Sequence, residues 1–113
     1  MIDLEKMSKE HEKLFPKATL ESQVWKLEEE VKEFEDAHKW EKINELADIV
    51  IVLGGLYRWC PRVAYYFYEG LTCMDYNWSL VEEEVNRKWQ INLKRKWEWN
   101  GKTYHHIKEK YND

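Results

Sequence analysis

Four carboxylates near the middle of the chain stand in two pairs whose spacing suits metal chemistry. Glu30 and Glu33 form the first pair, and Glu45 and Asp48 form the second. Residues three apart in a helix lie on one face, one turn apart, so each pair would present its carboxylates together. Hard oxygen ligands of this kind suit Mg²⁺, with Mn²⁺ as a substitute. The spacing therefore predicts a divalent-cation site formed by all four side chains.

The second pair carries the stronger signal, because it opens a helix that is apolar on nearly every side from Ile49 onward. A Glu and an Asp on a buried helix are costly unless they are paired or bind a cation. The alternative is that all four are ordinary exposed helix charges, and one Glu-x-x-Glu match alone would favour it. Two such pairs in quick succession, the second at the head of a buried helix, favour a metal site.

Basic and amide side chains lie farther along the chain, in a helix predicted over about residues 79–97. Lys88, Asn92 and Arg95 stand at i, i+4 and i+7, and two valines on the same face indicate that it points inward. Cations and an amide on an inward face suit phosphate oxygens bound beside a metal. The alternative is a solvated basic face on which Glu84 pairs with Lys88. The nearby acidic pattern favours phosphate binding.

Apolar periodicity predicts the elements that must position these residues. Thr19 is a suitable N-cap for the helix with the first acidic pair, and Pro61 limits the helix with the second. Short links between helices make neighbours antiparallel. We therefore expect an all-α fold, an antiparallel bundle of four to five helices. The predicted helices cover about residues 3–14, 20–38, 41–59 and 79–97.

Three further segments are assigned a secondary structure separately. The aromatic segment 61–77 is expected to form a loop or a short helix, and Asn100-Gly101 predicts a tight turn in a short C-terminal hairpin. The β-branched run from Asp48 to Gly55 could also form a buried parallel strand before a glycine loop. No comparable strand exists to pair with it, and its flanks have helical periodicity, so a helix is favoured.

Length and composition indicate a small globular protein, with residues 1–113 as one domain. The chain is 43% hydrophobic, which argues against disorder, and its net charge of −4 does not suggest a partner nucleic acid. Cys60 and Cys73 form no metal-ligand pattern and are expected to be free thiols in a reducing compartment. The charged N-terminus is no signal peptide, and the longest apolar run is too short to cross a membrane. We therefore expect a cytoplasmic protein.

The acidic pattern, Glu30-x-x-Glu33, eleven residues and then Glu45-x-x-Asp48, resembles the signature of the MazG-like, all-α nucleoside triphosphate pyrophosphatases. The consecutive acids Glu29-Glu30 are similar to the residues that the family usually has at this place in its motif. The later Lys-x-x-x-Asn-x-x-Arg run resembles the basic stretch of the family's last helix. The resemblance covers about residues 20 to 97. Short single-domain members of this kind are frequent in phages and prophages. The spacer of eleven is at the short end of the family's range, and segment 61–77 has no assigned counterpart.

The resemblance implies a fold and an activity. A (deoxy)nucleoside triphosphate would be hydrolysed between its α and β phosphates, giving the monophosphate and pyrophosphate. The four carboxylates would hold Mg²⁺, and Glu29 or Glu30 would orient or deprotonate the attacking water. Lys88 and Arg95 would steady phosphate charge while Asn92 positions an oxygen. Members of the family pack as dimers or tetramers, so a homodimer or homotetramer is expected.

Other side chains could also contact the substrate. Gln23 lies on the same flank as Glu30 and could hydrogen-bond a base or a metal-bound water, although a plain surface Gln is the commoner case. Trp25 and Trp40 could stack on a base, but most such Trp side chains are core residues. The competing function is a non-catalytic helical dimerisation or regulatory module of phage or prophage origin. Such a module would gain nothing from carboxylates on a buried helix.

Overall fold

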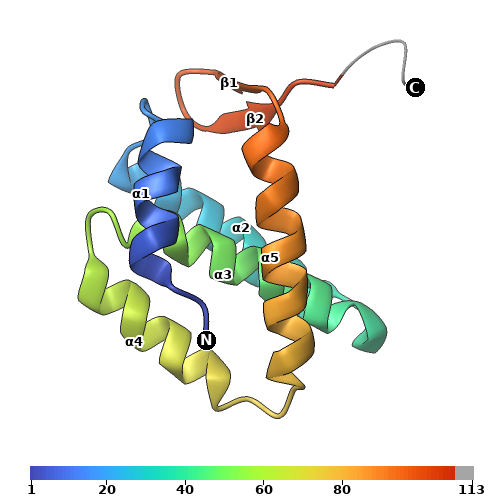
Figure 1. Ribbon diagram of the computed structural model, residues 1–113. Coiled ribbons are helices and arrows are strands. Elements are labelled where there is room, and N and C mark those ends of the chain that lie inside the picture. Colours follow the sequence, from blue (N-terminus) through green and yellow to red (C-terminus); the bar gives the residue numbers. More distant parts are fainter. Residues whose placement is uncertain (109–113) are drawn as a thin grey trace.

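The computed structural model describes residues 1–108 and is mainly helical in that range, which confirms the all-α expectation (Figure 1). Five α-helices are followed by a small antiparallel hairpin. A single turn of 3-10 helix, η1, joins the second and third helices. The elements are α1 (Leu4–Leu14), α2 (Leu20–Asp36), η1 (Lys39–Glu41), α3 (Lys42–Leu56), α4 (Pro61–Thr72), α5 (Trp78–Lys94), β1 (Trp97–Trp99) and β2 (Tyr104–His106).

Helix α3 is the centre of the fold. Leu46, Val50 and Leu53 are completely buried, and α1, α2, α4 and α5 all pack against this helix. The segment that could have been a strand is therefore covered by helices on every side. A helix satisfies its backbone hydrogen bonds internally, which suits a segment with no neighbouring strand to pair with. The helical interpretation of residues 48 to 55 is confirmed.

Helices α2 and α3 run antiparallel, as predicted (Figure 1). The Thr19 hydroxyl accepts a hydrogen bond from the Ser22 backbone, and the Ser22 hydroxyl accepts one from Thr19, so a capping box starts α2. The helix ends at Asp36, and α3 begins at Lys42 after η1. Because this connection is short, the chain turns back directly and the two helices that carry the acidic pairs pack against each other.

Helix α4 forms from the aromatic segment that was expected to be a loop or a short helix. Pro61 occupies its first turn, where a missing N–H costs nothing. Ala64 and Tyr68 are buried against the core, whereas Val63 and Tyr66 are 59% and 67% exposed. The helix therefore covers α3 with one face and leaves an apolar face uncovered within residues 1–108.

Helix α5 ends at Lys94, three residues before the predicted end at Trp97. Arg95 has extended backbone angles, and the Trp97 indole donates a hydrogen bond to the Asn92 carbonyl. The chain then enters the hairpin, whose turn at Asn100-Gly101 was predicted and whose glycine has a φ of 92°. Arg95 is therefore the C-cap residue of α5 and not an interior one, although its backbone N–H still bonds to the Ile91 carbonyl as in a helix.

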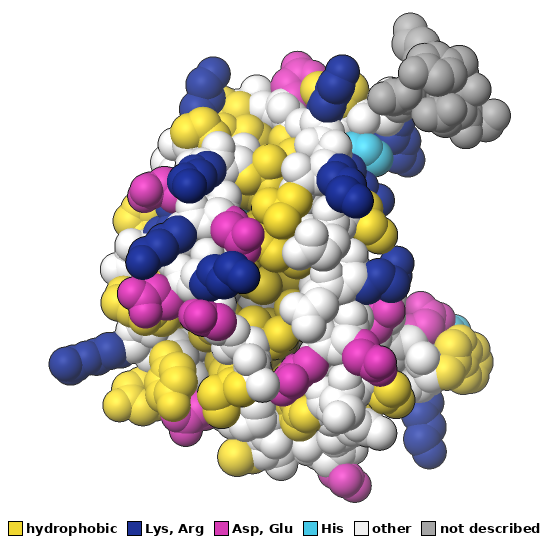
Figure 2. Space-filling view, viewed as in Figure 1, with side chains coloured by type: hydrophobic (Ala, Val, Ile, Leu, Met, Phe, Trp, Pro, Cys, Tyr) yellow, Lys and Arg dark blue, Asp and Glu magenta, His cyan; other side chains and the backbone are white. Residues whose placement is uncertain are grey.

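The hairpin and α5 close one side of the molecule against α1. The Phe15 ring lies 5.0 Å from both the Trp97 and Tyr104 rings. The Trp89 indole donates a hydrogen bond of 3.0 Å to Glu10. Hydrophobic side chains form a band between α1 and α5, and Lys and Arg side chains flank it (Figure 2). Every helix within residues 1–108 is too short or too polar to cross a membrane.

Candidate metal centre and adjoining cavity

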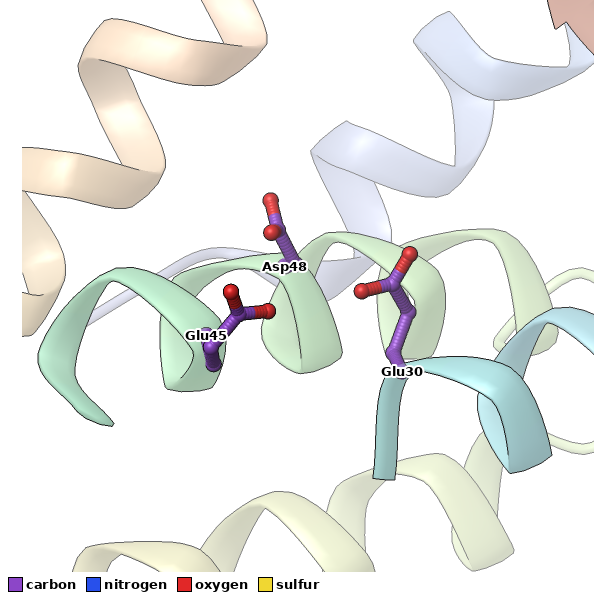
Figure 3. Close-up of side chains that lie close together, drawn as sticks. All are labelled: Glu30, Glu45 and Asp48. Carbon is purple, nitrogen blue, oxygen red and sulfur yellow. The ribbon is translucent and has the colours of Figure 1, made fainter. Parts of the chain in front are cut away.

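Three of the four predicted carboxylates converge. Glu30 of α2 and Glu45 and Asp48 of α3 each offer one oxygen, and these oxygens lie within 4.8 Å of one another. Asp48 lies between the two glutamates, and the Glu30 carboxylate points toward it across the gap between the helices (Figure 3). We call Glu30, Glu45 and Asp48 the acidic triad. Its members are half-buried, so the charges gather where solvent screens them only in part.

The triad is not satisfied by the protein alone. Oε2 of Glu30 and Oε2 of Glu45 are both buried and have no hydrogen-bond partner among the described residues. Burial, followed by the charges of Asp48 and Glu33, raises the pKa of Glu30 to about 8. Burial and Asp48 likewise raise the pKa of Glu45. These carboxylate oxygens accept no hydrogen bond and lie close to other negative charges. A hard divalent cation, which prefers oxygen ligands, would relieve both costs.

Lys88 already neutralises part of this charge. Its ammonium donates a hydrogen bond of 2.8 Å to Oδ1 of Asp48 and another of 3.2 Å to the Asn44 carbonyl. The Lys88 side chain is 17% exposed, so this ion pair is partly withdrawn from water. The alternative pairing with Glu84 is not formed, since Glu84 binds Arg87 instead. Lys88 therefore lies at the acidic site, as its predicted role beside a metal requires.

Glu33 and Glu29 lie at the edge of the site. Both are exposed, and Glu33 lies outside the triad. Both are nevertheless close enough to Glu30 for their charges to raise its pKa. The i, i+3 spacing placed Glu33 on the correct side of α2 but could not show how far its side chain lies from α3. Glu33 can join the site only through a side-chain movement.

A cavity of about 250 Å³ adjoins the acidic triad. Glu30 and Asp48 form its acidic end, and Lys26 and Arg95 add cationic groups to its lining. The rest is mainly aromatic and amide in character, with side chains from α1, α2, α3, α5 and the hairpin. These remaining lining residues include His11, Phe15, Gln23, Trp89, Asn92, Trp97 and Tyr104.

Gln23 is a buried lining residue of this cavity rather than a surface glutamine. It is 7% exposed, and its amide nitrogen donates a hydrogen bond of 3.4 Å to the Val52 carbonyl. The buried imidazole of His11 lies beside it, since both side chains flank Gly55. The predicted flank of α2 thus carries a polar group that is held in place from two sides.

Asn92 and Arg95 both line the cavity, although only Asn92 belongs to α5. Asn92 is half-buried and Arg95 is exposed. Arg95 is the C-cap residue of α5, three residues after Asn92. The structure thus brings all three predicted phosphate-binding residues to the region of the acidic triad and its cavity.

The two tryptophans considered for base stacking belong to neither the cavity lining nor the hydrophobic core among residues 1–108. Trp40 is 80% exposed and stacks on His38, which contradicts its assignment to the core. It lies in η1, where the backbone turns outward between helices. Trp25 is half-buried, and the Lys102 ammonium lies 4.4 Å from its ring centre. Neither tryptophan lines the cavity.

Several cavity residues were not identified from the sequence. His11 and Phe15 belong to the predicted first helix and its end, Lys26 precedes the acidic pair by one turn, and Tyr104 lies in the hairpin. Lys26 had a detectable signal, because it stands four residues before Glu30 on the same face. The other three come together only through tertiary packing, which no local spacing reveals.

Comparison of the chain with models of protein families, with curated proteins and with solved structures finds no match.

Proposed function

We propose that the protein is a Mg²⁺-dependent pyrophosphohydrolase that cleaves a (deoxy)nucleoside triphosphate to the monophosphate and pyrophosphate. One observation carries the proposal: three carboxylates from two helices converge, and two of their oxygens are buried without partners. The sequence resemblance to MazG-like pyrophosphatases gives the reaction its class. The adjoining cavity, with Lys26 and Arg95 in its lining, gives a polyanionic substrate a place beside the metal.

The chain's own residues have distinct parts in this reaction. Glu30, Glu45 and Asp48 would hold Mg²⁺, with Glu33 swinging in from the edge of the site. The bound ion would neutralise phosphate charge and lower the pKa of an attacking water. Glu30, which lies in the acidic triad, would orient that water or accept its proton. Glu29 beside it is the second candidate for this proton transfer.

The cationic residues would hold the triphosphate. Lys88 would exchange its bond with Asp48 for a phosphate oxygen once the metal neutralises that carboxylate. Arg95 and Lys26 would contact the outer phosphates, and the Asn92 amide would position an oxygen. Water attacks at the anhydride between the α and β phosphates, the bridging bond breaks, and its electron pair leaves with pyrophosphate. A reducing cytoplasm, rich in nucleotides, suits both this substrate and the free thiols of Cys60 and Cys73.

A homodimer or homotetramer is part of the proposal. Four side chains on the uncovered face of α4 are between 37% and 67% exposed, which is an apolar surface suited to a second copy. Within α4 these side chains are Val63, Tyr65, Tyr66 and Phe67. The same surface supports the competing function, a helical dimerisation or regulatory module without catalysis. Light scattering reports the oligomeric state, and only an activity assay separates the two functions.

The test is pyrophosphate release from a panel of ribo- and deoxyribonucleoside triphosphates with saturating Mg²⁺. We expect turnover by the wild type and its loss in Glu45→Ala. Glu28→Ala, which removes an exposed carboxylate from α2 outside the triad, is the matched control and should keep turnover. Absence of release from every substrate, with the protein folded, would favour the dimerisation module.

A further inference from the structure

Two buried side chains of the cavity lie in a line of polar groups that begins at Arg58, just beyond the end of α3. Nη1 of Arg58 lies 3.1 Å from Nδ1 of His11, and the same nitrogen donates to the Phe15 carbonyl over 3.0 Å. His11 is 5% exposed, and its Nε2 and the Gln23 amide nitrogen both lie beside Gly55, where an added Cβ would be 2.5 Å and 2.2 Å from them. Gln23 donates to the Val52 carbonyl. This line of polar groups therefore runs from Arg58 through His11 to Gln23, and both His11 and Gln23 line the cavity.

The chemistry of these groups fixes the direction of each bond. A guanidinium has only donors, so Nδ1 of His11 must accept, and the proton of the neutral ring must lie on Nε2. Burial, with Arg58 beside the ring, lowers the pKa of His11 to about 3, so the imidazole is neutral at ordinary pH. The Nε2–H then faces the Gln23 amide, and the amide oxygen is the acceptor left for it, because the Gln23 nitrogen donates to the Val52 carbonyl.

The fixed amide keeps unused hydrogen-bonding capacity. An amide has two N–H groups and two oxygen lone pairs. The contacts with Val52 and His11 use one of each, which leaves one donor and one acceptor with a defined arrangement. The two side chains pack directly against the Gly55 backbone, because a Cβ on Gly55 would lie 2.2 Å from the Gln23 nitrogen and 2.5 Å from His11 Nε2. The cavity thus presents a polar pair of known polarity.

The size and lining of the cavity indicate what would use that pair. Its volume of about 250 Å³ is below the roughly 300–1,000 Å³ of pockets that enclose drug-sized ligands. A flat ring with part of a sugar fits this space, whereas a triphosphate must extend beyond it toward the acidic triad. Phe15, Trp97 and Tyr104 supply aromatic surface for stacking, and a nucleobase is the ring that combines a stacking face with adjacent donors and acceptors.

We propose that this cavity binds the nucleobase of the substrate, that Gln23 selects the base, and that His11 is a positioning residue that sets which way the Gln23 amide points. The substrate class is then a nucleotide whose base offers a complementary acceptor and donor to one amide. This inference rests on the proposed function for its ligand, although it concerns binding and not hydrolysis. A buried amide of fixed polarity discriminates strongly, because the wrong base leaves a polar group unpaired.

The test measures dissociation constants of the nucleoside monophosphates of all the common bases by calorimetry with Mg²⁺ present, so that no turnover is required. In the wild type we expect at least a tenfold spread between the best and worst base. Gln23→Met keeps the side-chain length but removes the amide, and His11→Phe keeps the ring that packs on Phe15 but removes the Nε2 proton. Both should reduce the spread to threefold or less.

Ser8→Ala is the matched control, because Ser8 is a buried polar residue of α1 that bonds only to the Glu5 carbonyl and does not line the cavity. It should keep the wild-type spread. Nitrogen NMR of labelled imidazole gives an independent readout, with the His11 proton expected on Nε2. A proton on Nδ1, or an unchanged spread in Gln23→Met and His11→Phe, would overturn the inference.

The outcomes separate the two proposals. Base-selective binding without any pyrophosphate release would leave this inference standing and remove the proposed hydrolase. Pyrophosphate release from every triphosphate at equal efficiency, with no base-dependent binding, would do the reverse.

Discussion

Lys88 and Asp48 form an ion pair of 2.8 Å between α5 and α3 at the acidic triad. The pair joins the residue expected to hold phosphate to a residue expected to hold metal. In the metal-free protein, this lysine occupies a position where a cation is needed, so it competes with a divalent ion for one carboxylate. Asp48 can hold the metal and Lys88 can hold phosphate only if the bound ion displaces Lys88 from Asp48.

This competition predicts the effect of removing Lys88. Lys88→Met should increase Mg²⁺ affinity about fivefold, since a partly exposed ion pair is worth at most about 1 kcal/mol. Lys88→Arg keeps the charge and should leave the affinity near the wild-type value. Calorimetric titration with Mg²⁺ measures both. Weaker binding by Lys88→Met would instead show that the lysine orients Asp48 for the metal.

The metal should stabilise the fold. At a concentration a hundred times its dissociation constant, a ligand adds about 2.7 kcal/mol, or a rise of roughly 10 °C in Tm for a chain of this size. Differential scanning with and without Mg²⁺ should show this rise in the wild type. It should vanish in Asp48→Ala and persist in Glu28→Ala. A rise of equal size in all three proteins would locate the metal elsewhere.

The raised pKa of Glu30 makes stability depend on pH in a defined direction. The folded carboxyl has a pKa of about 8, above its ordinary value of 4.5, so folding favours the protonated form. The stability of the metal-free protein should therefore fall as pH rises from about 4.5 to 8. Glu30→Gln should flatten that fall in urea unfolding curves with a chelator present. The same slope in wild type and Glu30→Gln would contradict the assignment.

His11 predicts the opposite dependence at lower pH. Its folded pKa of about 3 lies below the ordinary 6.5, so the neutral ring stabilises the fold above pH 6.5 and this contribution is lost as pH falls toward 3. His11→Phe should lose stability less steeply over that range than the wild type does. His38→Phe, which replaces an exposed imidazole, serves as the control and should follow the wild-type curve.

Two glycines offer a matched pair for testing the cavity wall. Gly55→Ala should destabilise the protein by about 1–3 kcal/mol, since the added methyl would overlap Gln23 and His11. Gly70→Ala meets no atom within 4 Å in α4 and should stabilise it by about 0.5–1 kcal/mol. Denaturant unfolding measures both. Equal changes in the free energy of unfolding for the two substitutions would show that Gln23 and His11 shift readily to accommodate the added methyl group.

The sequence predicted what depends on local spacing. The i, i+3 rule placed Glu30, Glu45 and Asp48 on facing sides of two helices, and the apolar run after Asp48 predicted the buried helix correctly. The end of the last helix was predicted less well, because α5 stops at Lys94 with Arg95 as its C-cap residue. Domain extent, oligomeric state and activity stay predictions.

The cavity could not be predicted in the same way. His11 and Tyr104 are far apart in the chain and line one cavity only because the hairpin packs against Phe15 at the end of α1. Trp40 shows the converse limit, since its size suggested a core position while the backbone turn at η1 directs it outward. Helical periodicity gives the direction of a side chain on its own helix and not what lies opposite.

The acidic triad and the cavity differ in how much of the chain each requires. The triad is contained within residues 30 to 48, whereas the aromatic wall joins Phe15 to Trp97 and Tyr104. During synthesis, the carboxylates can therefore come together while the hairpin is still inside the ribosome. A nascent chain would acquire its cation-binding half first and its selective half only near the end of translation. Early termination before residue 97 would leave the carboxylates without the enclosure that discriminates among ligands.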